Sequence, residues 1–495
     1  MTLGSRDAVS DLARKALRTW TEEEAETVLS VWLAANGPDS AILQWRALLL
    51  RALDRRAEAI ALLQQAARIL PTDGGIAHAL AQVHLEAGLR SSVLFETALR
   101  LAPTRTEARL SLIAAYYAEG RGGEALNLLA GALDSNPGWL DGHRQFAQLC
   151  TLLGRSEEAL KPLCQAIARF PDVLRLRIDA LELLMAAGDY VGAVDLADQG
   201  LSRSGNLPEL MVRKATALDE LGQQDQAGAL FSRCGDAQDG AHACRLIRHH
   251  LRQGSPEAVL RVASPWLDRA EATEVWPYAS LAWRMLGDDK ADWLEAQEGL
   301  VRIHDLAECG LDWSALANRL RHIHANSGQF SNQSVNGGTQ TDGPLFARIE
   351  PEISAVRRAV VAALEQHVAG LPAADPGHPQ LSLRRDRPVR FSGSWSVRLS
   401  GQGFHRYHHH PQGWFSAVLY VTVPDSLAGA EGKLALGGSP PELGLQLGPS
   451  RHVAPQSGRL VVFPSTMWHA TEPFTDGERM TIAFDLARPP EEMQE

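Results

Sequence analysis

Cysteine is scarce in this sequence of 495 residues. There are five cysteines, none stands in a C-x-x-C pair, and none follows Cys309. An odd number without close pairs argues against a disulfide framework and against a thiolate metal site, and it fits a reducing compartment. The N-terminal stretch lacks the apolar segment of a signal peptide, and no segment is long and apolar enough to span a membrane. We therefore expect a soluble, cytoplasmic protein with no membrane segment.

Positive charge is also in short supply. The chain has 48 Lys and Arg against 59 Asp and Glu, a formal net charge of -11, and most of the acidic excess precedes residue 326. Such a surface repels phosphate backbones and anionic headgroups, so neither nucleic acid nor a membrane surface is an expected partner. Apolar residues make up 45% of the chain, enough for sizeable cores. The length predicts two or three domains.

A repeat organises the first half of the chain. Four glycines recur every 34 residues, at Gly120, Gly154, Gly188 and Gly222, and Gly88 stands before them. A small residue follows each glycine by five positions: Val93, Ala125, Ala159, Ala193 and Ala227. Pro137 and Pro171 stand twelve positions after two of these small residues. A small residue lets two helices approach closely, and proline ends a helix. These offsets resemble the tetratricopeptide repeat, with helix A, a tight turn at glycine and helix B.

The resemblance implies an all-α solenoid of stacked helical hairpins. We expect an N-terminal helical cap over residues 1–40, tetratricopeptide repeats over 41–235, and degenerate helical pairs over 236–325 that lead to a second domain. Stacking buries the apolar face of each hairpin and leaves a concave surface suited to a protein or an extended peptide. The alternative is a solenoid that serves only self-association or rigid spacing.

A different pattern begins at residue 326. By composition alone, residues 326–344 form a polar, Gly-rich linker, and a helical period follows from Ile353 to Val368. Beyond that point the period falls to two, and the segments WSVRL, FSAVLYVTV, KLALG, RLVVF and RMTIAFDL predict short strands. We expect residues 326–495 to form a double-stranded β-helix, or jelly roll, with flanking helices.

Histidines carry the chemistry of the predicted strands. In the stretch GFHRYHHHPQGW, residues two apart project to one face, so His408 and His410 share a face that His409 does not. His469 begins a later strand, and Arg479 and Thr481 follow on one face of the last strand. Two ligands from one strand and a third from another form a facial site with open positions. Arginine is the side chain best shaped to hold a carboxylate.

The order H-x-H, distal His and R-x-T, with the phrases GWFSAVLYVTVP and GRLVVFPSTMWH, resembles the 2-oxoglutarate- and iron(II)-dependent oxygenases often fused to tetratricopeptide repeats. The segments Gln333–Phe346 and His378–Leu381 resemble the N-terminal flank of that family. The resemblance implies iron(II) held by the three histidines, with 2-oxoglutarate as cosubstrate. It also implies that Arg479 and Thr481 grip the distal carboxylate of 2-oxoglutarate.

Tyr420 is the third cofactor-binding residue we expect, although core packing or pocket lining would equally explain Tyr420, Trp395, Trp414 and Trp468. We expect the other histidines of this region to be ordinary surface or hydrogen-bonded residues: His405, His409 and His452. A shared interior for His469 and Arg479 would also require an irregular turn between them, since a regular two-residue turn would place them on opposite faces.

The three predicted ligands differ from the usual two-histidine, one-carboxylate triad because His410 stands where the carboxylate is usual. The site therefore has one negative charge fewer than the usual triad. Three explanations stay open: His410 is itself a ligand, a carboxylate arrives from elsewhere, or the iron works without a cosubstrate. Asp342 and Asp485 are the acids to inspect.

The leading hypothesis is therefore an iron(II)- and 2-oxoglutarate-dependent dioxygenase that hydroxylates a protein or peptide held by the solenoid. The rival hypotheses are a non-catalytic scaffold with a degenerate oxygenase domain and a three-histidine dioxygenase that does not use 2-oxoglutarate. The sequence names neither the substrate nor the oligomeric state.

Overall fold

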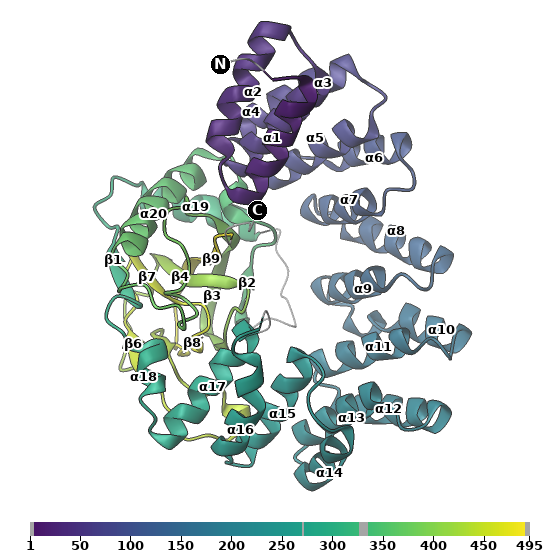
Figure 1. The fold of residues 1–495 in the computed structure, drawn as a ribbon, viewed down its shortest axis with the longest axis vertical. Helices are drawn as coiled ribbons and strands as arrows, with labels where there is room; N and C mark the ends of the chain where they lie inside the picture. Colours follow the sequence, from purple (N-terminus) through teal and green to yellow (C-terminus); the bar gives the residue numbers. More distant parts are fainter. Residues whose placement is uncertain (1–3, 270–271, 326–334, 491–495) are drawn as a thin grey trace.

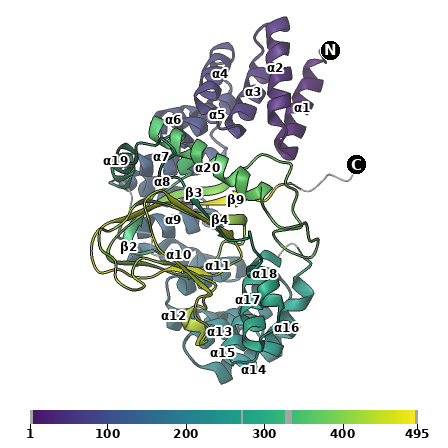
Figure 2. The ribbon, with the colours of Figure 1, turned by 90° about the vertical axis from the view of Figure 1, so that its left-hand side faces the viewer.

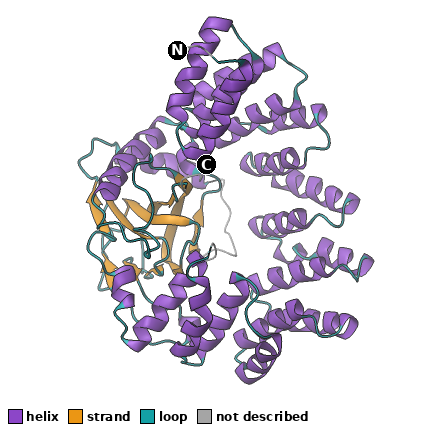
Figure 3. Ribbon diagram, viewed as in Figure 1, coloured by secondary structure: helices purple, strands orange, loops and turns teal. Residues whose placement is uncertain are grey.

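The computed structural model describes residues 4–269, 272–325 and 335–490 of the chain. Within them, helices fill the chain as far as Glu295, and the named strands lie from Arg302 onward. Figure 3 separates the two regions as an arc of helices and a strand-rich domain beside its inner side. The predicted combination of a tetratricopeptide-repeat solenoid and a jelly-roll domain is confirmed.

The solenoid is built of antiparallel helical hairpins. Its helices are α1 (Arg6–Thr19), α2 (Glu22–Asn36), α3 (Ser40–Ala52), α4 (Arg56–Ile69), α5 (Gly74–Glu86), α6 (Ser92–Leu101), α7 (Thr106–Ala118), α8 (Gly122–Ser135), α9 (Leu140–Leu152), α10 (Lys161–Arg169), α11 (Leu174–Ala186), α12 (Tyr190–Ser204), α13 (Pro208–Glu220), α14 (Gln224–Cys234), α15 (Gly240–Arg252), α16 (Pro256–Ala263), α17 (Ala272–Leu286) and α18 (Lys290–Glu295), with 3₁₀ turns η1 (Ser156–Glu158) and η2 (Ser264–Trp266). No helix in the described part of the chain is long and apolar enough to cross a membrane.

The turn between the two helices of a hairpin explains the repeated glycines. Gly120 has φ 77° and Gly222 has φ 76°, in the left-handed region that favours glycine. The same turn recurs at Gly254 between α15 and α16 and at Gly287 between α17 and α18, with φ of 65° and 66°. The degenerate pairs therefore repeat the hairpin of the regular units. In the α3–α4 turn Asp54 takes the place of glycine, with φ 60°.

The small residues of the repeat lie where the helices of a hairpin meet. Ala125 and Ala193 are fully buried, as close packing of neighbouring helices requires. Val93, however, is 66% exposed, whereas Phe95, which follows its N-cap residue by four positions as Ala125 and Ala193 do, is fully buried. The assignment of Val93 was wrong because the turn after Gly88 is two residues longer than in the later repeats, with α6 beginning at Ser92, which shifts the close-contact position to Phe95.

The strands form one curled antiparallel sheet in the order β1-β7-β4-β9-β3-β8-β5-β6, with β2 paired to β3. They are β1 (Arg302–Asp305), β2 (Val335–Gln340), β3 (Phe391–His408), β4 (Gly413–Thr422), β5 (Leu434–Leu436), β6 (Arg451–Val453), β7 (Arg459–Pro464), β8 (His469–Thr471) and β9 (Arg479–Ala487). A sheet that curls in this way buries one face as an interior, and that interior holds the predicted site.

The long strand β3 joins the two walls of the sheet. Its first part pairs with β9 as far as Leu399, and its last part pairs with β8 from His405. The change of partner falls at Gln402, which has φ 69°, and at Gly403, where an added Cβ would lie 2.6 Å from the carbonyl oxygen of Ser400. This bend carries the histidine-rich end of β3 across to β8.

β8 and β9 do not form a hairpin, because β3 lies between them in the sheet. The expectation of an irregular turn joining His469 directly to Arg479 on adjacent strands was therefore wrong. The connection passes β3 at its bend, where the amide of Gln402 donates a hydrogen bond to the carbonyl of Phe474 at 2.7 Å. In a hairpin, the number of residues in the turn decides which face of the sheet each residue occupies. His469 and Arg479 are not joined by a hairpin, so both can face one interior.

The main core of the strand-rich domain reaches upstream of residue 326. β1 pairs with β7, with Arg302 opposite Val462, and α19 (Trp313–His324) packs with α20 (Pro351–Ala369) and β4. Leu300 and Leu316 are buried in this core. We therefore propose a domain boundary near residue 300. Of the Gly-rich segment, residues 326–334 lie outside the described residues, and the following residues form β2 rather than a linker.

Both ends of the solenoid contact the strand-rich domain, so the chain closes into a ring (Figures 1 and 2). At the N-terminal end the contact is ionic. Arg390 pairs with Glu22 at 2.6 Å and donates to the carbonyl of Ala52 at 2.9 Å, and Arg357 pairs with Asp54.

At the C-terminal end the contact is a shared hydrophobic core. Trp468 and Leu443, which lies in the 3₁₀ turn η4 (Pro441–Leu443), are buried together with residues of α15 and α17. Trp468 also donates from Nε1 to the carbonyl of Pro277 at 3.0 Å. This end of the solenoid is therefore packed as part of the domain that carries the histidines.

Candidate metal centre

The interior of the curled sheet contains a cavity of about 380 Å³. Its wall includes residues from β2, β3, β4, β5, β7, β8 and β9: Gln340, Trp395, Val397, His405, His408, His409, His410, Ser416, Ala417, Val418, Leu434, Phe463, His469, Ala470, Thr471, Arg479, Thr481, Ala483, Phe484 and Asp485. Five histidines and one arginine thus meet in a space with several apolar walls, and such a concave mixed surface is typical of a ligand site.

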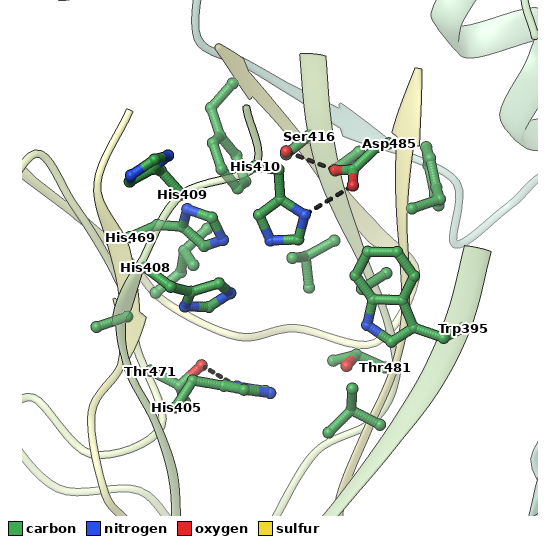
Figure 4. Close-up of a pocket in the computed structure, with 18 of the residues that line it drawn as sticks. Trp395, His405, His408, His409, His410, Ser416, His469, Thr471, Thr481 and Asp485 are labelled. Atoms are coloured by element: carbon green, nitrogen blue, oxygen red, sulfur yellow. Dashed lines mark hydrogen bonds and ion pairs between the residues drawn. The ribbon is translucent and has the colours of Figure 1, made fainter. Parts of the chain in front are cut away.

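Three of the predicted residues come together. His408, at the end of β3, His410, just after it, and His469, at the start of β8, place their candidate ligand nitrogens within 4.8 Å of one another. The ring centroids are 4.1 Å apart for His408 and His469 and 5.1 Å apart for each pair with His410. Figure 4 shows the three rings around one space.

Hydrogen bonds at Nδ1 orient the three rings. The Nδ1 atoms of His408 and His469 lie 2.8 Å and 3.1 Å from the carbonyl oxygens of Arg406 and Met467. A carbonyl can only accept, so each Nδ1 carries the proton and Nε2 carries the lone pair that a metal requires. Burial also lowers the pKa of His408 to about 3 and holds that of His469 well below its usual range. Both rings are therefore neutral at physiological pH.

A carboxylate is absent from the triad position that His410 occupies, but one stands behind the His410 ring. Asp485 accepts a hydrogen bond from His410 Nδ1 at 2.6 Å through Oδ2, and from Ser416 Oγ at 2.6 Å through Oδ1 (Figure 4). A carboxylate that fixes a metal-binding histidine in this way raises the basicity of the ring and supplies negative charge one step from the metal. Asp342, the other acid considered, lines a separate cleft beside the solenoid.

Arg479 lies in the wall of the same cavity and is 1% exposed. Its Nε donates to the carbonyl of Gly432 at 3.3 Å, and its guanidinium carbon lies 4.9 Å from the centre of the Tyr420 ring. No carboxylate in the described part of the chain forms an ion pair with it. Thr481 is also buried in the wall. The cavity therefore holds a guanidinium with donor capacity left over.

Tyr420 is not part of the cavity wall. It is fully buried, packs among Leu434, Val461 and Phe463, and its hydroxyl has no hydrogen-bond partner in the described residues. Its ring lies against the Arg479 guanidinium. Tyr420 thus contacts a predicted binding residue, whereas the sequence hypothesis had it bind the cofactor.

Other wall residues were not assigned to the site by the sequence. His405 lines the cavity and lies 3.1 Å through Nδ1 from Thr471 Oγ1, and Trp395 stacks on His410 at 5.5 Å with an interplanar angle of 3°. On β9 the wall residues alternate through Arg479, Thr481, Ala483 and Asp485. This period of two places Asp485, one of the two acids singled out in the sequence, in the wall with Arg479.

His409 and His452 have structural contacts of their own. His409 meets the ring of Trp468 edge to face, with centroids 4.6 Å apart. The Nε2 of His452 lies 3.3 Å from Glu472 Oε1 at the surface. Neither belongs to the group of histidines whose ligand atoms converge.

The fold and the cavity define a helical-repeat protein that carries a β-barrel-like domain with a three-histidine centre. Residues 393–485 match the family model described as "Putative 2OG-Fe(II) oxygenase". The resemblance noted in the sequence is thereby confirmed for this part of the chain. No relative was found among curated proteins.

Several solved structures are similar to parts of the chain. MamA from Desulfovibrio magneticus RS-1 is 17% identical, with 34% of this chain and 99% of that one covered and a TM-score of 0.30. YrrB, a tetratricopeptide-repeat protein with an unusual peptide-binding site, is 20% identical over 34% and 88%, with a TM-score of 0.28. A Pseudomonas putida prolyl-4-hydroxylase is 20% identical over 40% and 96%, with a TM-score of 0.27.

Proposed function

We propose that this protein is an iron(II)- and 2-oxoglutarate-dependent oxygenase that hydroxylates a protein or peptide recruited by its repeat solenoid. His408, His410 and His469 would hold the iron. Arg479 and Thr481 would bind the distal carboxylate of 2-oxoglutarate, with Tyr420 supporting the arginine through its ring.

The observation that carries the proposal is the buried arginine in the histidine cavity. Moving a guanidinium out of water without a partner is costly, so such a group persists where an anion binds it. The cavity contains three convergent imidazoles and Arg479 but no acid aimed at that arginine. A dicarboxylic acid that binds a metal at one end and a guanidinium at the other matches this combination.

The donor set fits iron(II) with one adjustment. Three imidazole ligands leave open coordination positions, and Asp485 supplies through His410 the negative charge that a carboxylate ligand would otherwise provide. When bound, iron with 2-oxoglutarate and dioxygen supplies the oxidant. One oxygen atom enters the substrate C–H bond as a hydroxyl group, and the other enters succinate as 2-oxoglutarate loses carbon dioxide.

The residues of the chain position the reactants and limit water. Val397, Leu434 and Phe463 form an apolar part of the wall, which strengthens the electrostatic contacts inside. Asp485 and Ser416 hold the His410 ring in one orientation. The protein thus keeps the ligands in place, while the metal carries the difficult chemistry.

A protein or peptide substrate is favoured by the solenoid. Stacked hairpins provide an extended surface, and here both ends of that surface are fixed to the domain with the cavity. A free metabolite would need no such array.

The first test measures the cosubstrate. Under anaerobic conditions, iron(II) and 2-oxoglutarate should give a metal-to-ligand charge-transfer band, and succinate should form once oxygen is admitted. Arg479→Ala should raise the apparent KM for 2-oxoglutarate by about 100-fold or more, since a charge-assisted bidentate contact is lost. The matched control is Arg398→Ala, which removes an exposed arginine paired with Glu478 at 2.6 Å; it should leave the KM unchanged.

The outcomes separate the rival functions. Absence of both the band and succinate in the wild type would indicate a scaffold without turnover. Oxygen consumption that continues without 2-oxoglutarate and is unaffected by Arg479→Ala would indicate a three-histidine dioxygenase.

The second test concerns the substrate. The full chain carrying His469→Ala should retain a partner without modifying it. Addition of wild-type protein, iron(II) and 2-oxoglutarate should then increase the mass of one peptide of that partner by one oxygen atom. A partner that is retained but never gains oxygen would contradict the proposed substrate class.

A further inference from the structure

An aromatic residue of the solenoid lies directly behind the metal centre. Tyr278, in α17, meets the ring of Trp468 at 5.4 Å and 75° and the ring of His409 at 5.9 Å and 85°. His409 and Trp468 contact each other as well, at 4.6 Å. The three rings form a cluster in which only Tyr278 comes from the solenoid, and we call it the Tyr278 cluster.

Two residues of the Tyr278 cluster are adjacent in the chain to the metal ligands. His409 stands between His408 and His410, and Trp468 immediately precedes His469. All three candidate ligands are thus peptide neighbours of a residue that Tyr278 contacts.

The ligands themselves sit at the ends of strands. His408 is the last residue of β3, His410 lies beyond it, and His469 is the first residue of β8. Outside β3, the amide of His410 bonds to the carbonyl of Ser465 at 2.9 Å. Strand ends lack ladder bonds on one side and are less constrained than strand centres, so the backbone there needs other contacts to hold three nitrogens in place.

Tyr278 is itself held firmly by the solenoid. It is 7% exposed, and its hydroxyl interacts electrostatically with Arg248 of α15. Arg248 in turn donates to Glu220 of α13 at 3.0 Å. The Nε1 of Trp468 completes the attachment by donating to the carbonyl of Pro277. A continuous set of packed and hydrogen-bonded side chains therefore runs from α13 to the ligand backbone.

We propose that Tyr278 is a positioning residue for the metal centre, through which the last helical pairs of the solenoid set the spacing of His408, His410 and His469. The inference rests on the proposed function of these histidines as metal ligands. A change that moves the Tyr278 ring relative to His409 and Trp468 would then change metal affinity, and metal binding would reciprocally stabilise α17.

The test compares two variants of α17. Tyr278→Leu removes the ring that contacts His409 and Trp468. Trp283→Leu removes a ring of similar burial, 4% exposed, whose ring contacts are with Trp276 and Lys290 instead. Co(II) is the probe, because its absorption spectrum reports the coordination geometry and its titration gives a Kd without catalysis.

We expect Tyr278→Leu to weaken Co(II) binding by about 10-fold or more and to alter the Co(II) spectrum, since contacts behind metal ligands carry effects of that size. Trp283→Leu should stay within about threefold of the wild type even though both variants lose packing. Tyr278→Phe, which keeps the ring, should restore most of the affinity and the spectrum.

A second measurement uses the unaltered chain and does not depend on how well the variants fold. Amide hydrogen exchange in α17 should slow when Co(II) is added, whereas exchange in α7, which has no contact with the Tyr278 cluster, should not change. Two results would overturn the inference while leaving the metal site intact. One is equal Co(II) affinity and spectra for Tyr278→Leu and the wild type. The other is amide hydrogen exchange in α17 that does not change when Co(II) is added. Failure of the wild type to bind Co(II) would instead overturn the proposed function, and this inference with it.

Discussion

Two buried charges, Glu86 in the solenoid and Arg479 in the strand-rich domain, are balanced in opposite ways. In the solenoid, Glu86 is 9% exposed and pairs with Arg51 at 2.5 Å and Arg56 at 3.4 Å. In the strand-rich domain, Arg479 is 1% exposed, contacts the Gly432 carbonyl and the Tyr420 ring, and forms no ion pair with a carboxylate of the described residues. Charge that is balanced internally serves the fold, whereas charge left open in a cavity indicates a missing ligand.

The largest effect should follow the removal of one histidine from the metal centre. His469→Ala should reduce Co(II) affinity by more than about 100-fold, because one of three nitrogens is lost, with little change in the melting temperature. Isothermal titration and thermal denaturation measure the two effects. His452→Ala, which alters only a surface histidine, is the control and should bind Co(II) as the wild type does. Equal affinity in the two variants would remove His469 from the site.

Replacing the charges by leucine should give opposite signs in the two regions. Arg479→Leu should raise the free energy of unfolding of the ligand-free protein by about 1 to 3 kcal/mol, because a buried charge without a counterion disappears. Glu86→Leu should lower it by about 1 to 3 kcal/mol, because Arg56 and Arg51 lose their partner. Denaturant titration measures both. A loss of stability in Arg479→Leu would mean that the arginine serves the fold.

The next effect concerns the carboxylate behind His410. Asp485→Asn keeps the shape of the side chain but removes its charge, so we expect a loss of Co(II) affinity of about 10- to 100-fold. The free energy of unfolding should change less than in Glu86→Leu. Ser416→Ala, which removes the other hydrogen bond to Asp485, should give a smaller loss of the same kind. An unchanged affinity in Asp485→Asn would show that the negative charge comes from elsewhere.

The smallest effect should come from an exposed pair in the solenoid. Arg121 and Glu124 form an ion pair at 2.6 Å on the surface of α8, and exposed pairs of this kind contribute little. Glu124→Gln should leave both the melting temperature and Co(II) affinity unchanged within error. A measurable loss of stability would mean that charge matters in the solenoid beyond its buried pairs.

Local spacing predicted much of the fold. The 34-residue interval of the turn glycines follows from one hairpin geometry, and the period of two from Trp395 onward follows from the pleat of a strand. Val93 was misassigned because the turn after Gly88 holds two extra residues, although the interval to Gly120 is short, and the register of α6 relative to the glycine shifts with it. The supposed hairpin before Arg479 failed for a related reason, since strand order depends on contacts between distant segments.

The alternation of side chains along the strands was enough to predict the residues that meet at the site. His408, His410, His469, Arg479 and Thr481 meet at one cavity. The hydrogen bond of Asp485 to His410 joins residues 75 positions apart, and the contact of Trp468 with Pro277 joins residues 191 apart. Neither pairing has a local sequence pattern, so only the folded chain reveals them.

The attachment of both ends of the solenoid to one domain fixes how many hairpins the array can hold. In an open array a unit can be gained or lost with little effect on the rest, because each unit contacts only its neighbours. Here the two attachment points, near Glu22 and near Pro277, are set by the dimensions of the strand-rich domain. Duplication or deletion of a 34-residue unit would therefore break one attachment, and repeat number in this protein is a constrained quantity.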